Sequence, residues 1–473
     1  MHPRDIKNKG SNSVLANELY ALVVDIPSLT SIDFTDCHIG SSNNSMLSPP
    51  SSLASIGIAL QQTNNADKRR STNCSVCGRL DKLCIGKNQM STVDIQELVN
   101  GLHARRGLKH LDIHDMNLHA RQIEQILSTL LTYNPERLTY LDVSYPTNMP
   151  GVSPGLIETI LERCMQLQVL RLKGHRGLQF SQLIFKCQPS LVELDMSLMK
   201  HTDHDILQLT QWIRSWTSSS GNPGRSGSQS SSDSTKVNSN GNRSSIIEVP
   251  ISPVSLSLST RSSASSSSTT IKQHILRLDD CGLHGGHLRD IIQSIYPSGK
   301  VHVSFNGNPV LKDVVYLPKL FPIFTHGTRG PTSLALGRIE WEENSLRELF
   351  DCLRHNQTLT HLDLAQSGFV LGTGKQVSHD MVRVLTRLFE RNTALKELTF
   401  RSSTPLLGKA ISQALIGLKH NQSLERLDLT GLELGDTGAQ ALADVLEHNR
   451  TLQALQIDQN MVCNNKKELG RIK

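Results

Sequence analysis

The feature that most constrains this sequence is a short leucine motif that recurs along most of its length. It is plainest near the C-terminus, where SLERLDLTGLELGDTGAQALADVLEHNR is followed by TLQALQIDQNMV. The positions that repeat 28 residues later are Leu424, Leu427, Leu429, Leu432 and Leu434, against Leu452, Leu455, Ile457, Asn460 and Val462. A chain that repeats one pattern in this way folds as a stack of similar units rather than as separate globular domains.

Each unit combines a strand with a helix. In the pattern LxxLxLxx(N/C/L)xL, apolar side chains alternate as they do in a short strand with one buried face, and a turn follows. Further along, Ala439, Leu442, Ala443 and Leu446 recur at helical spacing, and Asp436 stands where a helix cap is expected. One turn of the coil is therefore predicted to be strand, loop, helix, loop.

The same strand motif occurs many times upstream. Copies contain Leu29, Leu108, Leu138, Leu167, Leu191, Leu276, Leu334, Leu359 and Leu395, and VHVSFNGNP is a degenerate member. Together with the two C-terminal copies this makes about twelve units, and most neighbouring strands lie roughly 24 to 36 residues apart, a typical solenoid period. We predict an α/β solenoid in which helices line a curved parallel sheet.

The segment LGDTGAQALADVLEHNRTLQALQIDQN closely resembles the leucine-rich repeats of the ribonuclease-inhibitor-like superfamily. The resemblance covers Leu15 to Val462 apart from two insertions, and it is specific for fold rather than function. Relatives of this repeat class include inhibitors, NLR sensor arrays, tropomodulins, the CARMIL group of actin-capping regulators and the Ran GTPase-activating protein. The resemblance implies a scaffold for a protein partner. The cytoskeletal regulators are favoured because their arrays are long, interrupted by loops and free of a sensor ATPase.

Two stretches interrupt the coil, and their composition cannot bury enough apolar surface to offset the loss of chain entropy. The predicted organisation is a first repeat at 15–39, a low-complexity insertion at 40–89, repeats at 90–216, a Ser-rich disordered insertion at 217–270, repeats at 271–462 and a tail at 463–473. Serines beside Arg225, Arg243 and Arg261 could be phosphorylated, or the second insertion could be a plain spacer. Neither end carries a recognisable polar capping unit. We expect a longer protein, or ends that a partner covers.

Composition bounds the compartment and the partners. The chain has 49 Lys and Arg against 43 Asp and Glu, a formal charge of +6 without a dense basic block, so nucleic-acid binding is not expected. It has no apolar run of the roughly 20 residues that span a membrane, and its start lacks a signal-peptide core. We expect a cytoplasmic protein with reduced thiols. The sequons at Asn356 and Asn421 precede strands and are expected to be structural.

Cysteines provide the only spacing that resembles a metal site. Cys74, Cys77 and Cys84 in CSVCGRLDKLC look like the first half of a fungal binuclear zinc cluster, but three thiolates leave a tetrahedral zinc ion one ligand short. We therefore predict reduced loop thiols, with no metal and no cofactor. Cys37 and Cys281 replace the repeat's Asn460 and are predicted to fill a tight bend rather than to react.

Signatures of several common enzyme classes are missing from the sequence, which has no GxxxxGK[ST], no GxGxxG after a strand and no HExxH. We predict a protein that is not an enzyme. The alternative is a GTPase-activating protein of the Ran GTPase-activator type, although the short basic end NNKKELGRIK lacks the acidic tail of those proteins. A ubiquitin-ligase receptor would need an F-box-like segment, and none precedes the first repeat.

Binding is predicted on the concave face, which carries the strand residues that alternate with buried leucines. The residues predicted to bind a partner are Asp112, His114, Tyr140, Asp142, Tyr145, Arg171, Lys173, Asp195, Asp363, Arg401 and Asp428. Exposed aromatic and arginine side chains, Trp341 included, are expected to dominate. Trp212 and Trp216 are expected in the core. The alternative is that the aspartates are solvated carboxylates of the repeat's usual LDL strand.

Overall fold

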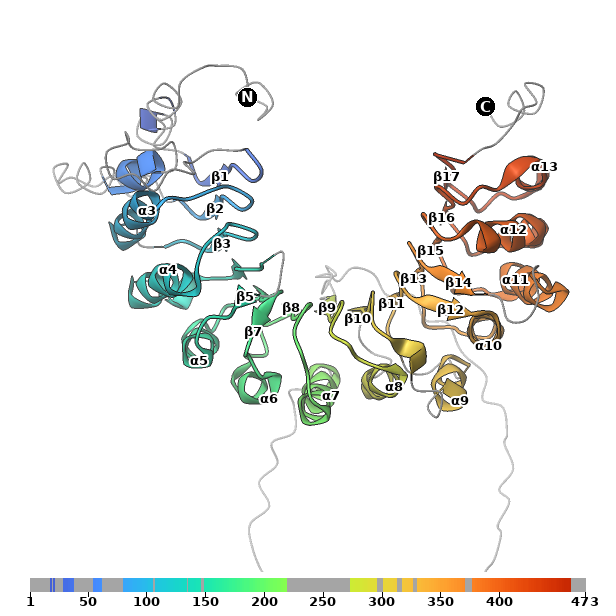
Figure 1. Ribbon diagram of the computed structural model, residues 1–473, viewed down its shortest axis with the longest axis horizontal. Coiled ribbons are helices and arrows are strands. Elements are labelled where there is room, and N and C mark those ends of the chain that lie inside the picture. The colour runs from blue at the N-terminus through green and yellow to red at the C-terminus, as the bar shows by residue number, and fades with distance from the viewer. Residues whose placement is uncertain are drawn as a thin grey trace, which may run out of the picture.

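The computed structural model describes Glu18, Tyr20 and Ala21 together with residues 29–37, 54–61, 80–104, 107–133, 135–145, 149–218, 273–295, 301–312, 317–325, 330–370 and 377–460. The chain coils into a solenoid that bends into a horseshoe (Figure 1). One long parallel sheet lines the inside of the bend and helices cover the outside. The predicted α/β solenoid is confirmed.

The main sheet contains 13 strands that follow one another in chain order. They are β1 (Ser31–Asp33), β2 (Lys82–Cys84), β3 (His110–Asp112), β4 (Tyr140–Asp142), β6 (Val169–Arg171), β8 (Glu193–Asp195), β9 (His274–Arg277), β10 (Val301–Ser304), β11 (Ser333–Ala335), β13 (His361–Asp363), β15 (Glu397–Thr399), β16 (Arg426–Asp428) and β17 (Ala454–Gln456). Each strand is parallel to its neighbours, and the middle residues, such as Leu111 and Leu141, stack in one buried row. The alternation of apolar residues therefore fixes which face of every strand is buried.

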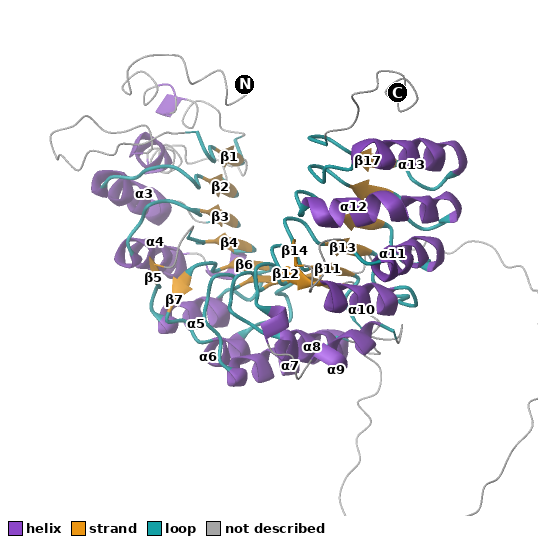
Figure 2. Ribbon diagram, turned by 45° about the vertical axis from the view of Figure 1, so that its right-hand side comes forward, coloured by secondary structure: helices purple, strands orange, loops and turns teal. Residues whose placement is uncertain are grey.

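The helices form an outer layer, one beside each strand or pair of strands (Figure 2). They are α3 (Thr92–Ala104), α4 (Ala120–Tyr133), α5 (Pro154–Arg163), α6 (Phe180–Leu183), α7 (Asp203–Ser218), α8 (Gly285–Ser294), α9 (Leu317–Leu320), α10 (Glu343–Leu353), α11 (His379–Arg391), α12 (Pro405–Ala414) and α13 (Gly435–His448). Short 3₁₀ turns occur at Pro135–Arg137, Ile184–Lys186, Val310–Lys312, Phe321–Phe324 and Leu415–His420. In α11, Met381, Leu385 and Leu388 face the sheet. Among the described helices, none is long and apolar enough to cross a membrane.

Two small parallel sheets lie beside the main one. β5 (Met149–Pro150) pairs with β7 (His175–Arg176), and β12 (Glu340–Glu342) pairs with β14 (Gly368–Val370). In the second of these sheets Trp341 lies opposite Phe369, and both side chains are buried. The central side chains of the β12–β14 sheet therefore belong to the core.

The first predicted insertion contains folded structure. Residues 54–61 are helical, and residues 80–89 form a further repeat around β2, in which Leu80, Leu83 and Ile85 are buried. The helical residues lie so close to α3 that a side chain on Gly57 would come within 2.3 Å of the Glu97 backbone. The prediction of a low-complexity insertion over all of 40–89 is therefore wrong at these positions.

The remaining parts of the predicted insertions lie outside the described residues. These parts are 40–53, 62–79 and 219–270, and the predicted tail at 463–473 also lies outside the described residues. α7 continues to Ser218, two residues past the predicted end of the repeats at 216, and the next described strand, β9, pairs directly with β8. The two repeats that flank the serine-rich segment are therefore neighbours in the coil.

A ladder of four buried asparagines joins the C-terminal repeats. These residues are Asn356, Asn392, Asn421 and Asn449, each three positions before a buried or partly buried leucine. The Asn421 side chain donates to the carbonyl of Phe389 in the preceding repeat at 2.6 Å, and its oxygen accepts the backbone N–H groups of Ser423 and Leu424 at 2.9 and 2.7 Å. The expected structural use of Asn356 and Asn421 is confirmed.

Candidate partner-binding surface

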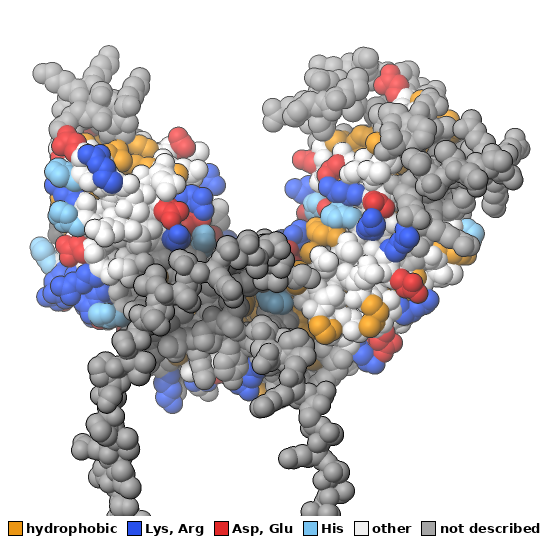
Figure 3. Space-filling view, turned by 180° about the vertical axis from the view of Figure 1, so that it is seen from behind, with side chains coloured by type: hydrophobic (Ala, Val, Ile, Leu, Met, Phe, Trp, Pro, Cys, Tyr) orange, Lys and Arg blue, Asp and Glu red, His pale blue; other side chains and the backbone are white. Residues whose placement is uncertain are grey.

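The concave face carries the predicted polar row in a continuous line. Strand pairing aligns Asp33, Cys84, Asp112, Asp142, Arg171, Asp195, Arg277, Ser304, Ala335, Asp363, Thr399, Asp428 and Gln456. Neighbouring strands in such a sheet lie about 4.8 Å apart. The row therefore runs along the inside of both arms of the horseshoe, which Figure 3 shows separated by a wide hollow.

The aspartates of this row have a structural contact in common. The carboxylate of each accepts the backbone N–H of the residue two positions on, as in Ser144 to Asp142 at 3.0 Å and Ala365 to Asp363 at 2.8 Å. The same contact occurs at Asp33, Asp112, Asp195 and Asp428. Burial raises the pKa of Asp142, Asp195 and Asp363. These carboxylates hold the turn after the strand, so they are more than solvated charges.

Five side chains form a connected cluster on β3, β4, β6 and β8, here named the tyrosine–arginine cluster: His110, Tyr140, Asp142, Arg171 and Glu193. The rings of His110 and Tyr140 stack with centroids 3.7 Å apart and planes 8° apart. The guanidinium carbon of Arg171 lies 5.4 Å from the centre of the Tyr140 ring. A planar aromatic pair beside a cation is thus presented on the concave face of the N-terminal arm.

Two carboxylates fix the Arg171 guanidinium. Its Nε and Nη2 atoms both lie 2.8 Å from Glu193 Oε1, and Nη1 lies 3.4 Å from Asp142 Oδ2. Burial disfavours the charged guanidinium, but Glu193, Tyr140 and Asp142 outweigh it and raise the pKa of Arg171. Arg277 reaches the same Glu193 oxygen at 3.4 Å. The Arg171 side chain keeps 30% of its surface exposed, so it is held in place without being covered.

The tyrosine hydroxyl of the cluster stays protonated. Burial, with nearby Asp142, raises the pKa of Tyr140, and the hydroxyl lies 3.5 Å from Asp142 Oδ2. Burial lowers the pKa of His110 and favours its neutral ring. The stacked pair is therefore uncharged at neutral pH, and the charges of the cluster belong to Arg171 and its two carboxylates.

His114 follows β3 on the concave face, two residues after Asp112. Its Nδ1 atom is 2.5 Å from Asp112 Oδ1, and this hydrogen bond raises the pKa of His114. Asp112, His114 and Asp142 each offer a ligand atom within 4.8 Å of the others. Because Arg171 already places a positive charge beside Asp142, these three side chains would bind a cation more weakly than their ligand atoms alone would indicate.

Two predicted anchors are buried, and their predicted exposure is wrong. Tyr145 is 3% exposed, its ring packs against His175 at 4.6 Å, and its hydroxyl has no hydrogen-bond partner among the described residues. Tyr145 shares the inward parity of Leu141 and Val143, four and two positions earlier, so it cannot face a partner. Trp341 is fully buried between exposed Glu340 and Glu342 for the same reason.

Other predicted residues lie where the repeat places them. Arg401 is exposed on the C-terminal arm and lies 3.9 Å from Asp428. Lys173 is half-buried, on the same face as Arg171. Trp212 is buried as expected, whereas the side chain of Trp216 lies outside the described residues. The predicted partner-binding residues therefore fall on two arms, and among them Tyr140, Asp142 and Arg171 belong to the tyrosine–arginine cluster.

Cysteines take structural positions where they are described. Cys84 is a buried residue of β2 whose pKa is raised by burial to about 11, whereas Cys74 and Cys77 lie outside the described residues. The Cys281 thiol donates to the carbonyls of Met196 and Asp279 at 3.4 Å, and Cys37 donates to the Thr35 carbonyl at 3.6 Å. The predicted role of Cys37 and Cys281 in tight bends is confirmed.

Sequence reasoning missed two members of the cluster, His110 and Glu193. Both occupy the first position of their strands and face the same side as the aspartate row two residues later. Apart from Tyr140, the prediction used the third and fifth positions of each strand and omitted the first. The same two-residue alternation would have found both side chains.

The family pattern described as "Leucine Rich repeat" matches residues 355–369 and 420–443. These ranges contain β13 and β16 with part of α13, which are the strand and helix of C-terminal units. The chain contains leucine-rich repeats.

Two known proteins are similar to this chain over part of their length. A Dictyostelium discoideum protein named "Rho GTPase-activating protein gacW" is 28% identical over 131 residues, which are 27% of this chain and 12% of that protein. The mouse RP105/MD-1 complex contains a chain that is 13% identical, with 84% of this chain and 62% of that chain covered and a TM-score of 0.36. The chain thus spans about an eighth of the first protein and less than two thirds of the second.

Proposed function

We propose that the leucine-rich repeats form a protein-interaction scaffold that holds its partner on the concave face, centred on the tyrosine–arginine cluster. The carrying observation is the pre-arranged Arg171 guanidinium beside the stacked rings of Tyr140 and His110. Tyrosine and arginine dominate the binding energy of protein interfaces. The proposal includes three further points: the repeats are of the ribonuclease-inhibitor-like class, the protein lies in the cytoplasm, and it acts in actin regulation.

The fixed position of Arg171 favours binding over a purely structural role. An arginine has five N–H donors, and the contacts to Glu193 and Asp142 use one on each guanidinium nitrogen. Within the described structure, two N–H donors of Arg171 therefore remain for a carbonyl or carboxylate of the partner. Because the side chain is already ordered, binding loses less side-chain entropy than at a free surface arginine.

The charge of the row also selects the partner. Six aspartates and two arginines line it, so it is acidic, whereas the whole chain has a formal charge of +6. On the side of the arms that Figure 3 shows, acidic and basic side chains are interspersed. Long-range electrostatics would bring a basic protein surface toward the inside of the horseshoe.

Affinity capture from cell lysate with matched variants tests the proposal. The cluster variant carries Tyr140→Ala and Arg171→Ala, and the control carries Arg401→Ala and Arg426→Ala on the exposed C-terminal arm. We expect a partner that wild type and control retain and that the cluster variant loses, with thermal melting verifying that all three proteins are folded. Equal capture by both variants would refute the proposal, and loss with the control alone would move the binding surface to the C-terminal arm.

The second candidate is a GTPase-activating protein, and the partial match to a protein with that name favours it. The exposed arginines Arg401 and Arg426 are the side chains that such an activity would use. Hydrolysis of GTP by Rho-type and Ran-type small GTPases, measured with and without the full chain, separates the two candidates. Under the scaffold proposal hydrolysis stays unchanged. Stimulation that Arg401→Ala or Arg426→Ala abolishes would establish the activator instead.

A further inference from the structure

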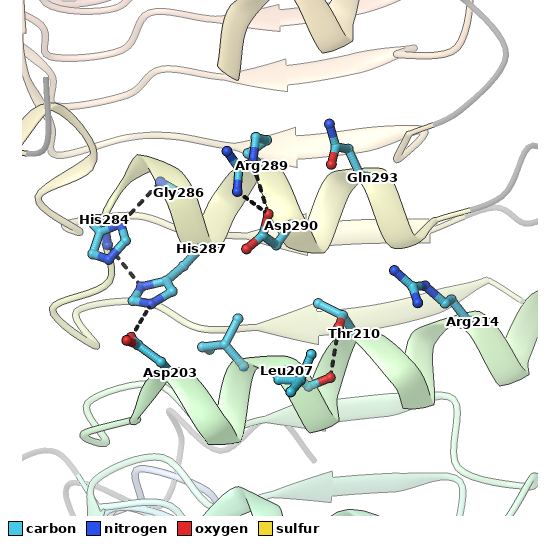
Figure 4. Close-up of a pocket in the computed structure, with 11 residues that line it drawn as sticks. Asp203, Leu207, Thr210, Arg214, His284, Gly286, His287, Arg289, Asp290 and Gln293 are labelled. Atoms are coloured by element: carbon cyan, nitrogen blue, oxygen red, sulfur yellow. Dashed lines mark hydrogen bonds and ion pairs between the residues drawn. The ribbon is translucent and has the colours of Figure 1, made fainter. Parts of the chain in front are cut away.

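A groove lies between helices α7 and α8 on the outer side of the solenoid, away from the concave face (Figure 4). Its volume is about 590 Å³, and its walls include Asp203, Leu207, His284, His287 and Asp290. α7 is the last helix before the serine-rich segment and α8 is the first after it. The groove therefore lies on the joint between the two repeats that this segment separates in sequence.

One end of the groove brings together two imidazoles and a carboxylate. His287 Nε2 lies 2.9 Å from Asp203 Oδ1, and the rings of His284 and His287 are 3.7 Å apart with planes inclined by 27°. Asp203, His284 and His287 each offer a ligand atom within 4.8 Å of the others. In Figure 4 the Asp203 carboxylate points from α7 toward the His287 ring on α8.

We propose that Asp203, His284 and His287 bind a zinc ion that clamps α7 to α8. Two imidazole nitrogens and one carboxylate oxygen are a ligand set that zinc takes in proteins, with water completing the tetrahedron. Donor atoms sit about 2.0 to 2.2 Å from zinc, so the ligands must approach one another slightly. The Asp203 side chain is 94% exposed and can supply that movement, and the open groove admits the ion and its water.

Binding requires a proton to leave His287 Nε2, where it now forms the hydrogen bond to Asp203. The proton moves through solvent to Nδ1 of the same ring, so the ring stays neutral; at present Nδ1 accepts the His284 backbone N–H at 3.4 Å. This distance is at the long limit for a hydrogen bond, so giving it up costs little. His284 Nδ1 accepts the Gly286 backbone N–H at 3.1 Å, which fixes the plane of that ring.

The alternative cation group on the concave face, Asp112, His114 and Asp142, is less suited. There Arg171 supplies a positive charge 3.4 Å from Asp142, and the Asp112 carboxylate is held by the His114 backbone. In the α7–α8 groove Arg289 is paired with Asp290 at 2.6 Å. The Asp203 carboxylate there is paired with His287.

Zinc titration of the full chain, without a histidine tag and after treatment with a chelator, tests this site. Four proteins are compared by calorimetry: wild type, Asp203→Asn, Asp203→His and the control Asp290→Asn, which removes the same charge from the same groove. Cysteines elsewhere contribute the same background to all four. Asp203 is exposed and its replacement leaves the histidines that cap α8 intact, so every variant is expected to fold.

We expect wild type, Asp290→Asn and Asp203→His to bind zinc at this site at least about 10-fold more tightly than Asp203→Asn. Zinc should also raise the melting temperature of the first three proteins and not of Asp203→Asn. Equal affinities in all four proteins would overturn the site, as would the lack of zinc binding by wild type. Loss in Asp203→Asn without recovery in Asp203→His would mean that Asp203 acts on helix α7 and is not a ligand.

Discussion

The two arms of the horseshoe carry the same strand motif but support it differently. In the C-terminal arm, a buried asparagine precedes each strand, and the side chain bonds both to the repeat before and to the turn of its own repeat. In the N-terminal arm the same positions hold Cys164 and Gln188. There a backbone carbonyl takes the place of the asparagine side-chain oxygen: the Cys164 carbonyl accepts the Leu167 backbone N–H at 2.9 Å. The motif alone therefore does not determine how tightly neighbouring repeats are joined.

The largest expected effect follows from this ladder. Asn421→Ala leaves the carbonyl of Phe389 and the N–H groups of Ser423 and Leu424 without partners in a buried turn. Each buried group left unsatisfied costs about 1 to 3 kcal/mol, so we expect the variant to lose about 4 kcal/mol of unfolding free energy. Urea denaturation followed by circular dichroism measures the loss.

Gln188→Ala is the matched change in the N-terminal arm. Its side chain makes one long contact, Nε2 to the Leu161 carbonyl at 3.5 Å. We expect a loss below about 1 kcal/mol, because a weak hydrogen bond contributes little. Equal losses for the two variants would show that the ladder does not distinguish the arms.

The second expected difference is acid sensitivity. His175 in the N-terminal arm is fully buried, its Nε2 donates to the Val143 carbonyl at 2.8 Å, and burial lowers its pKa from 6.5 to about 4. The unfolded chain binds this proton more readily, so the stability is complete above pH 6.5 and falls as the pH drops from 6.5 to 4. The loss at the end of this range is about 3 kcal/mol. The asparagines of the C-terminal ladder do not titrate.

Hydrogen exchange at pH 7 and pH 4.5 locates this effect. After correction for the intrinsic exchange rate, β4 to β8 should lose protection at the lower pH before β15 to β17 do. His175→Gln should be less stable at pH 7 but should lose less on acidification. An equal loss of protection in both arms of the wild type would contradict the assignment to His175.

The sequence predicted the strands, the aligned row and the structural asparagines because each depends on spacing alone. The prediction missed β2, although Leu80, Leu83, Ile85 and Asn88 fit the motif, because this segment was interpreted from the zinc-like spacing of its cysteines. The prediction of an exposed Tyr145 was wrong because the two-residue alternation puts Tyr145 on the same buried side as Val143. The contacts of Arg171 with Glu193 depend on side-chain conformations, which no repeat pattern specifies.

The smallest expected effect lies in the N-terminal arm and has the opposite sign to that of His175. The hydrogen bond to Asp112 raises the pKa of His114 above 6.5, so the stability from this pair is present below pH 6.5 and is lost as the pH rises through the folded value. Asp112→Asn should return the pKa of His114 toward 6.5, as measured by NMR titration of the imidazole C–H signals. An unchanged pKa would mean that Asp142, rather than Asp112, holds the charge on His114. That result would place the positive charges of both His114 and Arg171 on one carboxylate at the centre of the proposed binding surface.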